Sequence, residues 1–159
     1  MRANGSGCVR VLGICGNSGS GKTTLIEQLV PRLLLSGFSV AVVKHDAHRL
    51  QVDTPGKDSD RLFRAGADVV AHDSEQTFVR LHSGEMDVFG AASCLPSKYD
   101  LILVEGHKGS HAPKIWLLGE DEDGPPNEAQ KVLAILRRSE NIVDQAEELI
   151  REFIGKPAE

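Results

Sequence analysis

Eight residues near the amino terminus constrain the fold of this chain more than any other feature. Residues 16–23 read G-N-S-G-S-G-K-T and match the pattern G-x-x-x-x-G-K-[ST]. The preceding segment 9–15 is a short β-branched run, and residues 22–36 carry apolar side chains at helical spacing. We therefore expect a buried strand, a tight turn and a helix, which is the context that a phosphate-binding loop requires.

The residue types in this turn suit the binding of a nucleotide. Small residues allow successive backbone N–H groups to face phosphate oxygens, and the helix that follows adds its positive amino-terminal end. Lys22 supplies a mobile positive charge and is a candidate catalytic residue, while the Thr23 hydroxyl is placed to ligate Mg²⁺. The predicted nucleotide-binding residues are Gly16, Asn17, Ser18, Gly19, Ser20, Gly21, Lys22, Thr23 and Thr24.

Apolar strand patterns alternate with helical patterns along the rest of the chain. Strands are predicted at 39–44, 68–71, 77–81, 99–104, 114–118 and 131–136, and helices at 58–65, from Gly84 onward and at 141–154. Pro31 should kink or split the first helix. This alternation predicts an α/β protein with the P-loop NTPase fold, in which helices cover both faces of a mainly parallel central sheet in three layers.

The composition fits one globular domain. The chain has 159 residues, 40% of them hydrophobic, and 18 basic against 23 acidic side chains give a net charge of −5. We expect a single nucleotide-binding domain over 1–159, with 1–7 outside the folded part. The acidic balance argues against nonspecific nucleic-acid binding, and no apolar run spans a membrane or resembles a signal peptide, so a cytoplasmic protein is expected. Three cysteines without a C-x-x-C pair indicate free thiols.

Two acidic residues follow predicted strands and are candidate metal ligands. Glu105 follows the strand 101–104, and Asp46 follows the strand that ends at Lys44. Since the carboxyl ends of parallel strands face the ligand crevice, Glu105 is a candidate catalytic residue that holds Mg²⁺ with Thr23 and Asp46. Both carboxylates could instead be surface groups or helix caps.

The segment after the second strand offers donors for another phosphorylated ligand. The loop from His45 to Ser59 should hang over the nucleotide crevice. The predicted second-ligand residues are His45, His48, Asp53, Lys57, Asp58, Ser59 and Arg61. Two alternatives stay open: the loop only packs against the phosphate loop, or the two histidines bind a transition metal.

Several blocks together resemble one known family. K-H-D-A-H at 44–48 leads into D-T-P-G-K-D-S at 53–59 and A-G-A at 65–67, followed by L-V-E-G-H-K at 103–108 and P-K-I at 113–115. In this order they resemble the molybdopterin-guanine dinucleotide biosynthesis accessory proteins of the MobB family, over about residues 9 to 155. His107 and Asp60 depart from the family pattern, which usually has an aromatic residue at each position.

The resemblance implies a function as well as a fold. Members of that family are dimeric GTP-binding adapter proteins that hydrolyse GTP weakly, and they assist a MobA-type nucleotidyltransferase that joins molybdopterin to GMP. The expected ligands are therefore GTP, Mg²⁺ and molybdopterin or its dinucleotide form, and the expected partners are that enzyme and a second copy of the chain. No N-K-x-D or T-K-x-D guanine motif follows a strand, so the preference for GTP rests on the resemblance.

Two other functions use the same phosphate loop. A small-molecule or nucleotide kinase usually has an arginine-rich lid, whereas the stretch 120–130 is acidic and would repel phosphate. A metal-insertion GTPase of the nickel type usually has a histidine-rich tract or a Cys-His motif, and the sequence has neither. The acidic run at 119–126 is expected to be a solvated loop.

Overall fold

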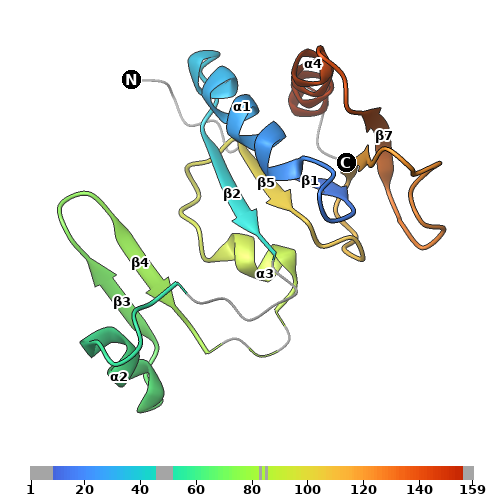
Figure 1. The fold of residues 1–159 in the computed structure, drawn as a ribbon. Coiled ribbons are helices and arrows are strands. Elements are labelled where there is room, and N and C mark those ends of the chain that lie inside the picture. The colour runs from blue at the N-terminus through green and yellow to red at the C-terminus, as the bar shows by residue number, and fades with distance from the viewer. Residues whose placement is uncertain (1–8, 46–51, 83, 85, 156–159) are drawn as a thin grey trace. The chain divides into compact units, whose positions relative to one another are not determined.

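A computed structural model describes residues 9–45, 52–82, 84 and 86–155 of the chain (Figure 1). Asp46 and His48 therefore lie outside the described residues. The strands are β1 Arg10–Gly16, β2 Val40–Lys44, β3 Val69–His72, β4 Thr77–Arg80, β5 Leu101–Glu105, β6 Lys114–Leu118 and β7 Val132–Arg137. The helices are α1 Lys22–Leu35, α2 Asp58–Arg64, α3 Val88–Ser93 and α4 Ile142–Gly155.

Five strands form one parallel sheet, which confirms the predicted α/β fold. Their order is β2-β5-β1-β6-β7, and every neighbouring pair runs parallel. The strand β1 is in the middle and pairs with β5 on one side and β6 on the other. Because all five strands run the same way, their carboxyl ends meet at one edge, where β1 ends at Gly16 and β5 at Glu105.

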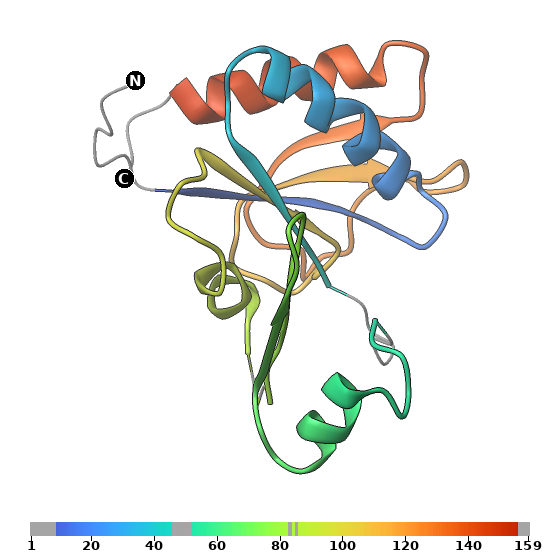
Figure 2. The same cartoon turned by 90° about the vertical axis from the view of Figure 1, so that its left-hand side faces the viewer.

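Helices cover both faces of this sheet, as predicted. The helices α1 and α4 lie on one face, where their buried side chains pack with those of the strands (Figures 1 and 2). That core consists of Leu12, Ile14, Leu25, Ile26, Leu29, Leu33, Leu101, Leu103, Ile115, Leu117, Leu136, Val143, Ala146 and Ile150. On the other face α3 contributes Val88 and Ala92, which pack with Ile102 and Val104 of β5.

Two local predictions differ from the structure. The helix α1 is continuous from Lys22 to Leu35, so the prediction that Pro31 could split it is wrong, while the alternative of a kink stays a prediction. A proline removes one backbone hydrogen bond, and the buried apolar side of the helix outweighs this loss. The third helix begins at Val88 rather than near Gly84, because the Asp87 side chain accepts a hydrogen bond from the Gly90 N–H at 2.8 Å and caps the helix there.

The described chain forms two compact units: residues up to His45 together with those from Asp87 onward, and the segment between them. The central sheet belongs to the first unit. In the second unit β3 and β4 pair antiparallel and form a two-stranded sheet of their own, so they do not extend the central sheet. The strands β1 and β5 and the helix α1, which carry the described residues of the predicted nucleotide site, belong to the first unit. That residues 1–159 form a single domain stays a prediction.

Arg80 on β4 forms ion pairs with two aspartates of the second unit and stacks on an aromatic ring. Its guanidinium donates to Asp53 at 2.9 Å and to Asp60 at 3.1 Å, and it lies 3.8 Å from the centre of the Phe63 ring. Asp60 is only 3% exposed and also accepts hydrogen bonds from the Gly56 N–H and from Arg64, both at 2.8 Å. An aromatic side chain at position 60 would leave Arg80 and Arg64 without this partner.

The Asp60 carboxylate makes the second unit sensitive to acid. The Gly56 N–H, followed by Arg64, lowers the pKa of Asp60 to about 2. A group whose pKa is lowered by folding stabilises the fold above its unfolded pKa, near 4, and this contribution disappears as the pH falls toward 2. We expect Asp60→Asn to increase pepsin cleavage within 52–82 at pH 4 to 5, and the difference from wild type to vanish near pH 2.

The exposed Asp58 of the same helix supplies the control. Its side chain is 96% exposed, so Asp58→Asn should leave the cleavage rate close to that of wild type. Equal cleavage of wild type and Asp60→Asn at pH 5 would contradict a stabilising role for the Asp60 network.

Candidate functional site

The glycine-rich turn lies where the central strand β1 leads into α1. Gly16, Gly19 and Gly21 have positive φ values of 150°, 79° and 89°. Side chains strongly disfavour this backbone region, so the glycines permit a turn that ordinary residues would not form. The turn is closed by a hydrogen bond from the Ser20 N–H to the Asn17 carbonyl at 3.3 Å. The predicted strand, loop and helix are thus confirmed.

Gly16 is also required by packing against β6. A Cβ atom at this position would lie 2.3 Å from the Leu117 carbonyl oxygen and 2.6 Å from the Ser20 hydroxyl. The Leu117 oxygen belongs to a paired strand of the central sheet and has no freedom to retreat. The start of the loop is therefore held tightly against the sheet.

Lys22 folds back over the loop that precedes it. Its ammonium donates to the Asn17 carbonyl at 2.7 Å and to the Gly16 carbonyl at 3.2 Å. Burial lowers the pKa of Lys22; Glu105 raises it and Lys108 lowers it further. The Ser20 hydroxyl is buried and has no hydrogen-bond partner among the described residues. An anion bound in the turn would supply an acceptor for the Ser20 hydroxyl and a further acceptor for Lys22, which already donates to two carbonyls.

Glu105 and Thr23 meet at the carboxyl edge of the sheet. The Thr23 hydroxyl donates to Glu105 Oε1 at 2.6 Å, although 82 residues separate them in sequence. The parallel pairing of β5 with β1 sets this contact, because it places Glu105 opposite Ile14, two residues before the loop begins. A hydroxyl and a carboxylate suit Mg²⁺, which prefers oxygen ligands and takes its other ligands from water and phosphate.

The segment after Glu105 is fixed by contacts with β1 and with the end of β2. The Gly106 N–H donates to the Ile14 carbonyl at 3.0 Å, and the thiol of the buried Cys15 donates to the Gly106 carbonyl at 3.0 Å. The His107 ring stacks on the His45 ring with centroids 4.4 Å apart. His107 thus packs as a flat ring against His45. Burial lowers the pKa of His107.

Two charged residues beside the loop were missed by the sequence predictions. Lys108 donates a hydrogen bond to the side-chain oxygen of Asn17, and Glu122 accepts one from the Asn17 amide nitrogen. Glu122 belongs to the acidic run that was expected to be solvated; its neighbours Asp121 and Asp123 are exposed, but its own side chain turns toward the loop. The position of Lys108 in the E-G-H-K block, three residues after Glu105, could have indicated a place near the loop. Nothing in the sequence around Glu122 indicated its contact with Asn17.

The described second-ligand residues have three different surroundings. Asp53 accepts hydrogen bonds from Arg80 at 2.9 Å and from the Ser59 hydroxyl at 2.9 Å, so both predicted residues have partners within the second unit. Lys57 is exposed, as are Asp58 and Arg61, whose side chains are 96% and 74% exposed. His45 stacks on His107 in the first unit. Contact of these residues with a second ligand stays a prediction.

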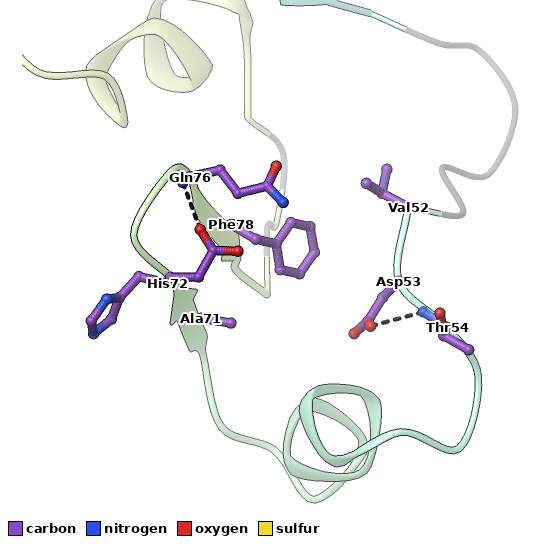
Figure 3. A pocket seen from close by; sticks show the side chains of 8 residues that line it. Val52, Asp53, Thr54, Ala71, His72, Gln76 and Phe78 are labelled. Atoms are coloured by element: carbon purple, nitrogen blue, oxygen red, sulfur yellow. Dashed lines mark hydrogen bonds between the residues drawn. The ribbon is translucent and has the colours of Figure 1, made fainter.

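A pocket of about 390 Å³ lies within the second unit, between the segment 52–54 and the β3–β4 hairpin. Figure 3 shows the Phe78 ring pointing into this space and the His72 ring pointing away from it. Among the second-ligand residues that the structure describes, Asp53 alone lines the pocket, and its two oxygens already accept hydrogen bonds from Thr54, Ser59 and Arg80.

The described residues contain neither a cluster of metal-ligating side chains nor a helix that could span a membrane. In those parts of the chain no group of three or more His, Cys, Asp or Glu side chains is arranged to hold a metal ion. Within the same residues, no helix combines the length and the apolar character needed to cross a membrane.

A central parallel strand that leads through a glycine-rich loop into a helix, with a threonine–glutamate pair beside the loop, defines a protein of the P-loop NTPase fold. Comparison with known proteins narrows this class. The family model described as molybdopterin guanine dinucleotide synthesis protein B, MobB, matches residues 11–138, and the chain belongs to this family.

Individual relatives and a solved structure agree with this assignment. The chain is 33% identical over 165 residues to the molybdopterin-guanine dinucleotide biosynthesis adapter protein of Haemophilus influenzae, covering 92% of this chain and 93% of the relative. The Escherichia coli adapter protein is 37% identical over 129 residues, covering 78% and 74%. A crystal structure of molybdopterin-guanine biosynthesis protein B superposes with a TM-score of 0.72 at 27% identity, covering 92% of this chain and 99% of the other.

The packing of Gly16 predicts that an alanine at this position lowers the stability of the protein more than an alanine at Gly19. Gly16→Ala should destabilise the protein far more than Gly19→Ala, because only the former places a methyl group against backbone atoms. At Gly19 nothing lies within 4 Å of the added carbon, so the cost is that of the left-handed backbone, roughly 1–2 kcal/mol. Urea unfolding of both variants measures the difference, and equal losses would contradict the close approach of Gly16 to β6.

Proposed function

We propose that the chain is a GTP-binding adapter protein for the synthesis of molybdopterin guanine dinucleotide. The observation that carries this proposal is the pairing of Thr23 with Glu105 next to Lys22 and the glycine-rich turn. These groups supply, at one edge of the sheet, an ammonium, a row of backbone N–H groups and two oxygen ligands for Mg²⁺. Membership of the MobB family and the names of its adapter relatives favour this function over a kinase.

Each residue has a distinct role in the proposed nucleotide site. The N–H groups of 16–24 bind the phosphate oxygens, and Lys22 leaves the Gly16 and Asn17 carbonyls to bind the outer phosphates. Thr23 and Glu105 hold Mg²⁺, with Asp46 as a further candidate ligand. The metal, when bound, neutralises phosphate charge. Hydrolysis is slow, because the cations that contact the loop within the described residues, Lys22 and Lys108, are lysines and not an arginine finger.

The second unit provides the surface for the other reactant in this proposal. The exposed Lys57 and Arg61 bind a phosphorylated ligand, molybdopterin or its dinucleotide form, while Asp53 and Ser59 shape the loop that presents them. His45, which belongs to the first unit, and His48, which lies outside the described residues, stay candidates from the sequence alone. The partner protein is a MobA-type nucleotidyltransferase, which acts in the cytoplasm.

A homodimer is part of the same proposal. The edge strand β7 exposes Leu133 and Ile135, whose exposed fractions are 54% and 49%. Large apolar side chains on the edge of a sheet favour association with another chain, because they are costly to leave in water. This exposure supports a dimer without identifying its geometry.

Calorimetry with GTP and ATP, with and without Mg²⁺, tests the nucleotide site directly. Wild type should bind GTP more tightly than ATP and more tightly with Mg²⁺. Lys22→Ala should weaken GTP binding at least about tenfold, the expected loss of a hydrogen bond to a charged group. Lys98→Ala is the matched control, since Lys98 lies near the opposite end of the sheet and packs over Tyr99. Absence of nucleotide binding to wild type would overturn the proposal.

A reconstituted synthesis of the dinucleotide tests the second unit separately. Arg61→Ala should leave GTP affinity unchanged but reduce the stimulation of a MobA-type enzyme, with roughly a tenfold higher concentration of adapter needed for half its effect. Arg138→Ala, which removes an exposed arginine of the first unit, should behave as wild type. Full stimulation by Arg61→Ala would remove Arg61 from the proposed ligand site.

A further inference from the structure

A second ammonium group lies beside the phosphate-binding loop. Lys108 follows Glu105 by three residues, and its Nζ donates a hydrogen bond to the side-chain oxygen of Asn17, the second residue of the loop. The same nitrogen lies 5.7 Å from the centre of the Trp116 ring, which limits its freedom. Lys108 is exposed at the surface, so its charge is accessible to a ligand bound in the loop.

The backbone that carries Lys108 is held by a buried lysine. Lys114 is 0% exposed, and its Nζ donates to the carbonyl of Lys108 at 2.8 Å and to that of Ser110 at 2.7 Å. A Cβ at Gly13 would lie 3.1 Å from the Lys114 Cβ, so the glycine makes room for this side chain. The hydrogen bonds from Lys114 therefore fix the backbone of the turn that carries Lys108.

Glu122 places a negative charge on the other side of the same asparagine. Its Oε1 accepts a hydrogen bond from the Asn17 amide nitrogen, while its Oε2 is buried and has no hydrogen-bond partner among the described residues. The Gly119 N–H, and then Asn17, lower the pKa of Glu122, so the side chain is an anion at neutral pH. The Asn17 amide thus joins a cation and an anion at the entrance of the loop.

The charges here are arranged around an anionic ligand. Lys108 lies close enough to Lys22 to lower its pKa, while Glu105 raises it. Two neighbouring ammonium groups repel each other, and a ligand with several negative charges relieves this repulsion better than one with a single charge. Glu122 acts in the opposite sense, because a carboxylate next to phosphate costs Coulomb energy.

We propose that Lys108 is a second phosphate-binding cation of the loop and that Glu122 competes with the phosphates for Asn17 and Lys108. The proposal rests on the proposed function, since it needs a nucleotide in the loop. Lys108 turns from the Asn17 oxygen to the phosphate chain when nucleotide binds, and the Glu122 carboxylate is displaced from the Asn17 amide. Lys108 and Glu122 together make the affinity for a nucleotide depend on the number of negative charges on its phosphates.

Calorimetry with GTP, GDP and GMP in Mg²⁺ buffer tests this proposal. Lys108→Ala should weaken GTP binding roughly tenfold and GMP binding much less, whereas Lys108→Arg should keep the preference for the triphosphate. Glu122→Gln keeps the size of the side chain and removes its charge, so it should strengthen GTP binding about two- to fivefold. Lys98→Ala should match wild type, and thermal unfolding should show that all variants are folded.

The outcomes separate this inference from the function on which it rests. If Lys22→Ala weakens GTP binding and Lys108→Ala does not, the nucleotide site stands and the role of Lys108 is overturned. If Glu122→Gln binds GTP more weakly than wild type, Glu122 contacts the nucleotide and does not compete with it. If wild type binds none of the three nucleotides, the proposed function itself fails.

Discussion

The close contact between Gly16 and β6 is the constraint on which the candidate site depends. The central strand β1 is paired on both sides, and its last residue turns away from the sheet where a side chain would meet the Leu117 carbonyl oxygen at 2.3 Å. Because only glycine fits, the loop leaves the sheet at one place and in one direction. Lys22 and Thr23, at the start of α1, are positioned by this exit.

Parallel pairing then brings distant residues to the same loop. The strand β5 ends beside β1 with Glu105 against Thr23, and the segment after β5 carries Lys108 to Asn17. The loop after β6 adds Glu122. These contacts follow from the fact that β1, β5 and β6 are neighbours whose carboxyl ends lie at one edge, which is where α/β proteins bind ligands. The order of the strands therefore determines which charged side chains lie beside the loop.

In the second unit, several polar residues of one sequence motif form hydrogen bonds with the fold itself. In the D-T-P-G-K-D-S block, Asp53 and Ser59 bond to each other, and Asp53 joins Asp60 in binding Arg80. These internal hydrogen bonds do not involve Lys57 of the block or Arg61, two residues after it, and both cations are exposed. From the sequence, Asp53, Lys57, Ser59 and Arg61 were equal candidates for a ligand site, because the hydrogen-bond partners of a residue cannot be read from its neighbours in the chain.

The amino-acid sequence by itself determined the phosphate-binding loop, the helix after it and the strand–helix alternation, because each depends on residues close together in the chain. It also led to the MobB family through the order of its motifs. The tertiary structure decided that β3 and β4 pair with each other outside the central sheet, that Pro31 stays within α1, and that Asp87 delays the start of α3. It alone placed Lys108 and Glu122 on Asn17, since contacts across 91 and 105 residues arise from strand order and side-chain packing rather than from local pattern.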